Sequence, residues 1–391
     1  MERFDSLKGR AFLFLLFLSF LWFLNFVGRT LFSPVLPLIE DEFHITHAKA
    51  SSIFIFQSVG YGISIFSSGL WSGLLGYKRS IVISLMVSAA VFFLIPFSSA
   101  FSTLYFYSFI MGLATGVYIP AVIPLITRLY NEKIWGKAIA IHDSSASIGV
   151  FGAPLIAMGL LHFFQWRGIF GVVALVFVIA AAAFAFLFDE LKVSRITRAA
   201  FGEFITRRSL WLLSVVWVFA ASTSLGIYSV LPLYLTKELH LDIQYANTIF
   251  GISRLGGFVV AIGSGYLVTR FSVRAVMASM LVISGAFTIL VGLAGSSLIA
   301  PALFLQASFI YGFFPAGLIA ISRMFELHVR SIATGFIFGV GVIFGWGVAP
   351  YLLGLSGDLL SFRFGILILG ILTMLASGLI FFLKELKPAR Q

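Results

Sequence analysis

The chain has 391 residues, of which 60% are hydrophobic and only 10% are charged, and it contains no cysteine. Soluble domains carry roughly 25% charged residues, so this composition excludes an ordinary soluble protein. The lack of cysteine excludes disulfides and thiolate metal sites. A net charge of +11 would suggest nucleic acid as the partner of a soluble protein, but here the positions of the charges give another explanation.

Apolar stretches follow one another along the chain, and a helix needs about 20 apolar residues to cross a bilayer. We predict twelve membrane-spanning helices, here called spans 1 to 12, at residues 11–39, 50–75, 79–99, 102–127, 138–162, 168–188, 209–235, 246–268, 275–297, 300–322, 332–356 and 363–383. Span 1 follows Lys8 and Arg10 as a signal peptide would. It is longer than a signal core and lacks a small-residue cleavage site, so we expect it to be retained.

Basic residues are concentrated in the connectors that lie on the same side as the two termini. The connectors on the opposite side carry only Lys49, Arg167, Lys237 and Arg363. Cytoplasmic loops are enriched in lysine and arginine. We therefore expect a multi-pass protein of the cell inner membrane with both termini in the cytoplasm and no nucleic-acid partner.

The sequence repeats itself at an offset of 195 or 196 residues across six spans. The repeated pairs are Pro37 and Pro232, Glu42 and Glu238, Gly69 and Gly265, Pro120 and Pro315, Arg128 and Arg323, Pro154 and Pro350, and Arg167 and Arg363. A constant offset indicates a duplication, which is a known plan of transporters with a site at the midplane. We predict an all-α fold of two pseudo-symmetric six-helix bundles, residues 1–190 and 209–391, joined by a cytoplasmic linker at 191–208.

Twelve spans, a 6+6 duplication and a basic central loop resemble the major facilitator superfamily over essentially the whole chain. In the loop motif between spans 2 and 3, Gly69, Gly76, Lys78 and Arg79 match the family, whereas Gly73 replaces the usual aspartate and Leu74 the basic residue after it. The second copy keeps Gly265, Arg270 and Arg274 but has Thr269 in place of the aspartate. The stretch Gly149–Pro154 loosely resembles the Gly-Pro motif of antiporters in the family. The resemblance implies transport by alternating access.

Two arginines, Arg29 and Arg254, lie inside predicted spans, one in each half. At 1.5 Å per residue, Arg29 lies about 16 Å and Arg254 roughly 14 Å from the outer surface, which places both near the midplane. An arginine at that depth costs at least ~2.5–3.5 kcal/mol and needs a partner or a function. Helix carbonyls or a buried acid could hold each arginine. Because Asp143 is the only acid within a predicted span, we favour an anionic substrate as the partner.

Each arginine also resembles a pattern found within the superfamily. Arg29, eight residues before Pro37, is similar to the pattern of organophosphate and organic-anion members. Arg254, within Ser253–Gly257, looks like the substrate arginine of oxalate:formate and monocarboxylate carriers. The resemblance therefore implies an anionic substrate that one or both arginines bind.

Further polar residues lie at a similar depth and could line the same aqueous cavity. They are Asn25, Gln57, Tyr61, Ser224, Tyr228 and Tyr311. Residues four apart in a helix share a face. This spacing separates Asn25 from Arg29, Gln57 from Tyr61, and Ser224 from Tyr228. The alternative is that they form hydrogen bonds between helices, as polar residues in membrane helices commonly do.

Asp143 and its neighbour His142 are candidates for proton coupling. Burial would raise the pKa of a carboxyl toward the working range, and histidine titrates near neutrality. The alternative is an ionised Asp143 paired with Lys137 or Arg128, replacing the acid missing at Gly73. Arg128 and Arg323 lie at the inner ends of spans 4 and 10, where we expect gating or structural roles.

We predict a secondary transporter of a small organic anion, a mono- or dicarboxylate, that is driven by protons or by exchange. The alternatives are an exporter of amphiphilic drugs or lipids and a non-transporting membrane sensor or scaffold. No P-loop or His-Glu-x-x-His motif is present, so the sequence predicts neither an enzyme nor ATP-driven transport. We expect no cofactor, no metal site and a monomer in the lipid bilayer.

Overall fold

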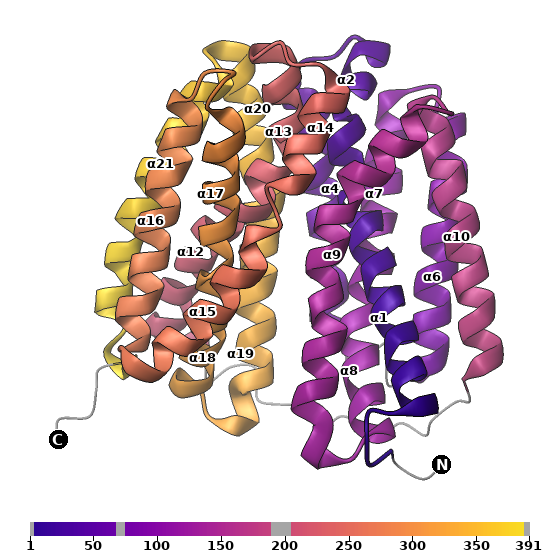
Figure 1. Cartoon of the computed structure of the whole chain (residues 1–391), viewed down its shortest axis with the longest axis vertical. Coiled ribbons are helices and arrows are strands. Elements are labelled where there is room, and N and C mark those ends of the chain that lie inside the picture. Colours follow the sequence, from indigo (N-terminus) through magenta and orange to yellow (C-terminus); the bar gives the residue numbers. More distant parts are fainter. Residues whose placement is uncertain (1–3, 68–74, 189–204, 387–391) are drawn as a thin grey trace. The chain divides into compact units, whose positions relative to one another are not determined.

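The computed structural model describes residues 4–67, 75–188 and 205–386, and every element named in these ranges is a helix (Figure 1). Most of the predicted linker, 191–204, lies outside the described residues, as does the part of the first loop motif from Gly69 to Leu74.

The first half contains nine named α-helices among the described residues. They are α1 (Gly9–Thr30), α2 (Phe32–Phe43), α3 (His47–Ser51), α4 (Ile53–Phe66), α6 (Tyr77–Leu94), α7 (Phe101–Gly116), α8 (Tyr118–Leu129), α9 (Trp135–Leu161) and α10 (Trp166–Leu187). Short 3₁₀ turns, η1 (Ile95–Phe97) and η2 (Glu132–Ile134), follow α6 and precede α9.

The second half contains helices interrupted by three π-helical segments. The α-helices are α12 (Arg208–Ala221), α13 (Ile227–Leu233), α14 (Ile243–Ile252), α15 (Gly256–Arg270), α16 (Val273–Leu293), α17 (Ile299–Tyr311), α18 (Phe313–Met324), α19 (Leu327–Val340), α20 (Ala349–Leu359) and α21 (Phe362–Ser377). The π segments are η3 (Ser222–Gly226), η4 (Tyr234–Glu238) and η5 (Gly341–Val348), and 3₁₀ turns η6 (Gly378–Phe382) and η7 (Lys384–Leu386) end the described chain.

Eleven helices in the described part of the chain are long and apolar enough to cross a membrane, with mean hydropathy between 1.4 and 2.8. Where a span is interrupted, its consecutive helical elements are counted together. The first span, Arg10–Phe43, for example, contains both α1 and α2. The remaining predicted span, 50–75, contains α4, and its residues 68–74 lie outside the described residues. The prediction of an all-α, multi-pass membrane protein is confirmed.

Three spans are broken at a residue that lies four positions before a proline. The breaks follow Thr30, Gly116 and Tyr311, and the prolines are Pro34, Pro120 and Pro315. Proline has no N–H, so it cannot bind the carbonyl four residues earlier, and its ring crowds that carbonyl. A proline therefore accounts for each of these interruptions, whereas other prolines, such as Pro37 and Pro124, lie inside helices that continue.

Side chains from neighbouring spans bind carbonyls beside two of these breaks. Ser84 donates a hydrogen bond of 2.6 Å to the carbonyl of Ala114, and Asn25 donates one of 3.0 Å to that of Thr115. In the second half, the hydroxyl of Ser264 binds the carbonyl of Gly312. Unpaired backbone groups cannot be left in hydrocarbon, so these contacts make the interruptions tolerable.

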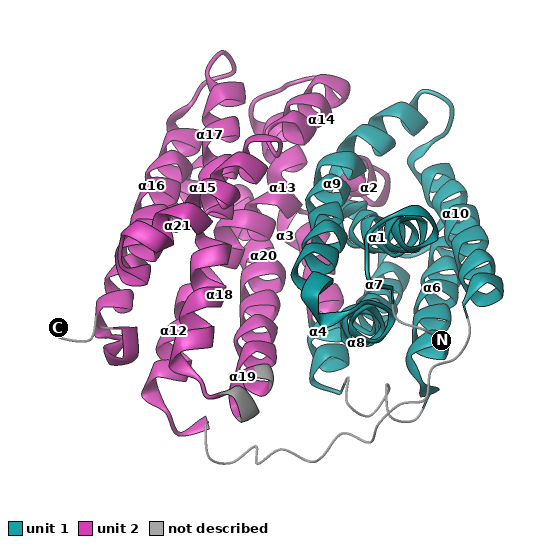
Figure 2. Ribbon diagram, turned by 60° about the horizontal axis from the view of Figure 1, so that its bottom comes forward, with its two compact units in different colours: residues 1–34, 59–197 teal, residues 35–58, 198–391 magenta. Residues whose placement is uncertain are grey.

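The chain forms two compact units, Met1–Pro34 with Val59–Thr197 and Val35–Ser58 with Arg198–Gln391 (Figure 2). Residues 35–58, which the repeat assigns to the first half, therefore belong to unit 2. They pack against α20 with little space: a Cβ atom on Gly354 would lie 2.7 Å from the His47 carbonyl oxygen. The chain enters this segment shortly after the break that follows Thr30.

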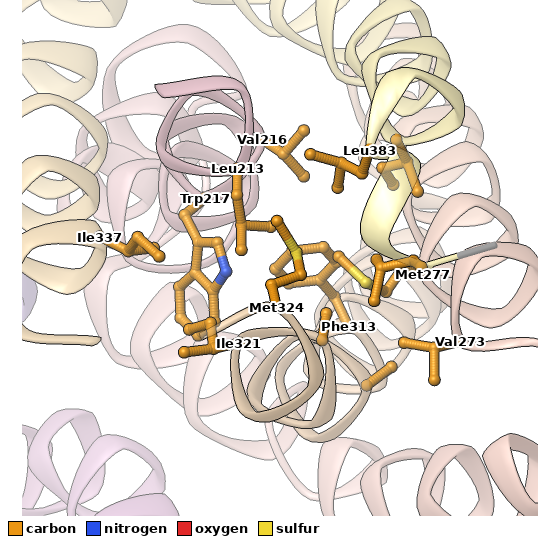
Figure 3. Packing of buried hydrophobic residues seen from close by; sticks show 14 of the residues in the cluster. Leu213, Val216, Trp217, Val273, Met277, Phe313, Ile321, Met324, Ile337 and Leu383 are labelled. Carbon is orange, nitrogen blue, oxygen red and sulfur yellow. The ribbon is translucent and has the colours of Figure 1, made fainter. Parts of the chain in front are cut away.

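Unit 2 has a hydrophobic core around Trp217 of α12 (Figure 3). The indole contacts the rings of Phe313 and Phe338, with centroids 5.5 and 4.4 Å away. Met324 and Ile337 lie in the same cluster. Because Phe313 is the first residue of α18, this packing holds span 10 in place immediately after its break.

The duplication is visible in the backbone and in hydrogen bonds. His44 and His240, which are 196 residues apart, both have a positive φ, of 48° and 54°. Arg167 donates to the carbonyl of Pro96 at 3.0 Å, and its repeat partner Arg363 donates to the carbonyl of Ala294 at 3.3 Å. The two arginines thus bind carbonyls at the ends of spans 3 and 9, respectively.

Candidate functional site

Arg254 lies in the interruption between α14 and α15 and is only 4% exposed. Its backbone N–H donates to the carbonyl of Gly251 at 3.0 Å, so the chain tightens here into a turn. Discontinuous helices commonly carry substrate sites in transporters because their backbone and side chains line a cavity. The interruption places Arg254 between two helices of span 8.

Two aromatic rings lie beside the guanidinium of Arg254. Its Cζ is 5.0 Å from the ring centroid of Tyr228 and 5.6 Å from that of Phe250, and the two rings are 4.3 Å apart. Both distances fall within the range of a cation–π interaction. Within the part of the chain that the structure describes, Nε and Nη2 of Arg254 have no hydrogen-bond partner. Arg254 is therefore held from the side by rings while two of its donor atoms stay unused.

Two glycines bring span 8 against span 10 directly after Arg254. A Cβ atom on Gly256 would lie 1.9 Å from Oγ of Ser308, and one on Gly257 would lie 2.6 Å from Cδ2 of Tyr311. Larger residues cannot fit here without movement. Tyr311 is the last residue of α17, so the break in span 10 lies against the start of α15.

Ser224, by contrast, is occupied by its own helix. It lies in the π segment η3, is 3% exposed, and its hydroxyl donates to the carbonyl of Ala221 at 3.3 Å. The same segment is bound from span 10, where Gln306 donates to the carbonyl of Thr223 at 2.7 Å. Single-turn π segments often mark functional sites, and here the irregular turn precedes Tyr228.

In unit 1, Arg29 is 3% exposed and lies in the last turn of α1. Its Cζ is 4.0 Å from the ring centroid of Tyr61 and 4.7 Å from that of Phe26. The structure thus brings together Arg29 and Tyr61, which the sequence predicted separately. Among the described residues, each unit thus has a buried arginine flanked by two aromatic rings.

Asn25 and Gln57 differ in how their amides are used. Asn25 donates to the carbonyl of Thr115, which supports the structural alternative for this residue. Gln57 is fully buried, and among the described residues neither its Nε2 nor its Oε1 has a hydrogen-bond partner. Gln57 therefore offers both a donor and an acceptor, as a residue that binds a ligand would.

His142 is fully buried in a stack of three rings. Its ring centroid lies 5.9 Å from those of both Trp22 and Tyr118, with interplanar angles of 14° and 12°. The Tyr118 hydroxyl donates to the carbonyl of Leu18 at 2.8 Å, so the 3.3 Å contact with His142 requires Nε2 of His142 to donate. Nδ1 is then the basic nitrogen of a neutral ring, and it has no partner among the described residues.

Asp143 is exposed, and no ion pair joins it to Lys137, Arg128 or any other described residue. The ion pair that we considered is therefore not formed in this structure. The guanidinium of Arg128 lies 5.4 Å from the ring centroid of Tyr77, and Arg323 is exposed. Both arginines lie in the last turns of their helices, α8 and α18.

Sequence reasoning missed Phe26 and Phe250, although a signal was present. Phe26 precedes Arg29 by three residues and Phe250 precedes Arg254 by four, which are the spacings at which side chains along a helix are neighbours. Among the residues that the structure describes, no group of three His, Asp or Glu side chains could hold a metal ion.

Two apolar grooves lie away from both arginines. One of ≈ 510 Å³ in unit 1 is lined by residues that include Phe20, Phe23 and Phe163. The other, of ≈ 440 Å³ in unit 2, is lined by residues that include Phe219 and Phe344. Neither arginine lines either groove, so the grooves and the arginines are separate features.

A family model described as Major Facilitator Superfamily matches residues 18–271 and 212–391. A protein TsgA homolog of Erwinia tasmaniensis is 24% identical over 224 residues, which are 56% of this chain and 56% of that protein. The multidrug efflux protein YfmO of Bacillus subtilis is 26% identical over 44% of this chain and 43% of that protein. The galactose-proton symporter of Escherichia coli K12 is 27% identical over 40% and 33%, respectively. The chain spans about half the length, or less, of these curated relatives.

Solved transporters share the fold at low sequence identity. A bacterial homolog of the human lysosomal transporter Spinster, in an inward-facing and occupied conformation, matches with a TM-score of 0.82 and 16% identity over 97% of this chain and 98% of that one. The nucleoside transporter NupG matches with a TM-score of 0.80 and 13% identity, over 95% and 99%. A D-xylose-proton symporter matches with a TM-score of 0.76 and 15% identity, over 97% and 98%.

Proposed function

Because the chain belongs to the major facilitator superfamily, whose members are transporters and not enzymes, we propose that it carries a small organic anion, a mono- or dicarboxylate, across the inner membrane by alternating access. The observation that carries the proposal is Arg254. It is a buried cation, 4% exposed, and two of its donor atoms have no partner within the described part of the chain.

A buried charge is costly unless it is paired and hydrogen-bonded, and in practice such a group acquires a partner. Tyr228 and Phe250 stabilise the guanidinium with their ring faces, but a ring face accepts no bidentate hydrogen bond. A carboxylate or phosphate does accept one, and its geometry matches the fork of arginine. An anionic substrate would supply the missing acceptor.

Two further residues extend this interpretation. In unit 1, Arg29 is another buried guanidinium, beside Tyr61, which by the same chemistry would suit a carboxylate or a phosphate. Gln57 has both amide atoms unused among the described residues and would suit a hydroxyl or carbonyl oxygen of the same substrate. Both residues were predicted from the sequence, and their roles are proposals here.

We also propose that transport is coupled to protons or to exchange of a second anion, with both termini in the cytoplasm. Two of the similar proteins are named as proton symporters, one of galactose and one of D-xylose. In this chain, the unpartnered Nδ1 of His142 and the exposed Asp143 are the candidate proton acceptors in span 5.

Export of amphiphilic compounds is the second candidate. The apolar grooves and the similarity to a multidrug efflux protein favour it. Such substrates are bound mainly by apolar contact and commonly carry a positive charge, which a buried arginine repels. The charge of the compound that binds therefore separates the two functions.

The test is substrate binding and uptake by Arg254 variants in reconstituted vesicles, after a thermal-shift screen against small carboxylates, sugar phosphates and cationic drugs. Arg254→Lys keeps the charge and loses the bidentate fork, so affinity for the anion should fall more than tenfold, above ~1.4 kcal/mol. Arg254→Gln should nearly abolish transport of the anion.

Arg270→Lys is the matched control, because Arg270 lies exposed at the end of α15, the helix that follows Arg254. It should leave the affinity for the anion unchanged. Normal uptake of the anion by both Arg254 variants would refute the proposal. Binding of cationic drugs in preference to every anion would favour the exporter.

A further inference from the structure

The two apolar grooves are formed by corresponding parts of the two halves. The unit 1 groove lies between α1, α9 and α10, and the unit 2 groove lies between α12, η5, α20 and α21. These elements belong to spans 1, 5 and 6 and to spans 7, 11 and 12, which are the same spans of each repeat. Neither Arg29 nor Arg254 lines a groove, so the proposed substrate site does not account for them.

The correspondence between the grooves holds residue by residue. Six residues that line the unit 1 groove have a partner 196 positions later that lines the unit 2 groove. The pairs are Phe23 and Phe219, Ile156 and Leu352, Leu160 and Ser356, Val172 and Ile368, Val173 and Leu369, and Val176 and Leu372. Among these pairs only the phenylalanines are identical. The two halves have therefore diverged in sequence while each has kept a groove in the same place.

Poor packing of α9 does not explain the groove in unit 1. At Gly149 this helix packs closely on α1, because a Cβ atom there would lie 2.6 Å from Cβ of Phe26 (Figure 1). At Gly159, which lines the groove, a Cβ atom would have no atom within 4 Å. Atoms beside an empty space lose dispersion contacts, so helices normally close such gaps. A groove that is open in both halves indicates an occupant that fills it.

The lining shows which chemistry the occupant has. No polar or charged side chain lines the unit 1 groove. In the unit 2 groove the polar lining residues are Ser222 and Ser356, and their hydroxyls donate to the carbonyls of Val218 and Ser361 at 2.8 Å. An ionic or hydrogen-bonding ligand would thus find no side chain free to bind it. A hydrocarbon chain needs none, and in membrane-spanning helices the acyl chains of lipids surround the protein.

The length of the groove also suits an acyl chain. In unit 1 it runs from Phe20 to Val27 along α1 and from Ile156 to Phe163 along span 5. Each of these ranges rises by about 10 Å at 1.5 Å per residue. The occupant is therefore extended along the helices, as a lipid chain in a bilayer is.

Both grooves end beside a connector between spans. Phe163 follows the end of α9, and its neighbours His162 and Gln165 are exposed. In unit 2, Ser356 lies near the end of α20 and Phe364 near the start of α21. An apolar groove that ends at the edge of the spans matches a phospholipid, whose chain lies in the hydrocarbon layer and whose headgroup lies at its boundary.

We propose that the two grooves are equivalent lipid sites, each of which binds one acyl chain of a membrane phospholipid. Lipid tails are as apolar as the grooves, so binding does not come from the exclusion of water. It comes from the additional dispersion contacts that a chain makes in a groove compared with a convex helix surface. The proposal depends on neither the charge nor the identity of the transported substrate.

The test is photolabelling in phosphatidylcholine vesicles that contain a small fraction of phosphatidylcholine with a diazirine in its acyl chain. Adducts are then mapped by mass spectrometry of peptides. Leu175 of α10 and Leu375 of α21 are 60% and 68% exposed, line neither groove, and report ordinary contact with lipid. Labelling of the lining residues in both grooves should exceed labelling of these two leucines by at least about threefold.

Two variants fill one groove each, so that the other groove serves as an internal control for folding. Gly159→Phe should lower labelling in the unit 1 groove to the level of Leu175 and leave the unit 2 groove unchanged. Leu352→Trp should do the reverse. Gly171→Phe is the matched control, because Gly171 of α10 also has no atom within 4 Å of a new Cβ but lines neither groove. It should preserve the labelling of both grooves.

Two results would overturn the proposal. Equal labelling of the grooves and of the two leucines in the parent protein would show that lipid acts there only as solvent. Labelling of a groove that survives its own filling variant would show that the lipid does not occupy it.

Discussion

Replacing Gly257 by alanine would place a methyl group against the ring of Tyr311. The new Cβ would lie 2.6 Å from Cδ2 and 2.9 Å from Cγ of that ring, so the ring or one of the two helices must move. Overpacking of this kind typically costs 1–3 kcal/mol. Because alanine is a better helix former than glycine by about 1 kcal/mol, the net loss of stability should be ~0–2 kcal/mol.

Gly263→Ala isolates the packing contribution. Gly263 lies in the same helix, α15, is exposed, and has no atom within 4 Å of the position that a methyl group would take. This variant should therefore gain up to ~1 kcal/mol from helix propensity alone. The difference between the two variants, ~1–3 kcal/mol, is the cost of the contact with Tyr311.

The assay is thermal unfolding of the purified variants together with the affinity for the anionic substrate. Displacement of Tyr311 should also weaken substrate binding, because the glycines directly follow Arg254. In a Tyr311→Ala background, Gly257→Ala should cost little or nothing, because the ring that the methyl group would meet is gone, as a double-mutant cycle would show. Equal stability of Gly257→Ala and Gly263→Ala would show that the two spans do not pack as described.

Three further predictions concern orientation, coupling and the buried polar network. A single cysteine at Lys49 should react with an impermeant reagent outside intact cells, and one at Lys133 should not; the reverse pattern would contradict the orientation. Asp143→Asn should abolish substrate accumulation driven by a pH gradient but leave substrate exchange intact, because Asp143 forms no ion pair with any described residue. Loss of both activities in uptake assays would indicate a structural role. Gln306→Leu should lower the free energy of unfolding by about 1–3 kcal/mol, since it leaves the carbonyl of Thr223 without its donor. Unchanged thermal stability would show that this hydrogen bond does not stabilise the fold.

The sequence predicts the helices and the buried arginines well because both follow from local rules. Apolar length defines the spans, and the three helix breaks lie four residues before prolines that the sequence displays. Arg29 and Arg254 stand out because charge is rare in apolar stretches. Their aromatic neighbours Phe26 and Phe250 were not predicted, although each precedes its arginine by three or four residues.

Contacts between segments that are distant in the sequence could not be predicted from such local rules. Asp358 binds the backbone of His47 across 311 residues of sequence, and Gln306 binds Thr223 across 83. Which polar residues meet depends on how helices pack, and no periodicity encodes that. For the same reason, proximity in the sequence suggested an ion pair between Asp143 and Lys137 that the structure does not form.

The assignment of residues 35–58 to unit 2 has a consequence for protein dissection. A cut in the central linker would divide the chain at the boundary of its ancestral duplication, but not at the boundary of its present packing. A fragment ending near residue 190 would expose the face of α3 that carries Ala48 and Ala50, and its complement would expose the surface around Gly354 on which that face packs. We therefore expect the two fragments to be stable only when they are co-expressed and reassociate, so that a split transporter would serve as a complementation reporter.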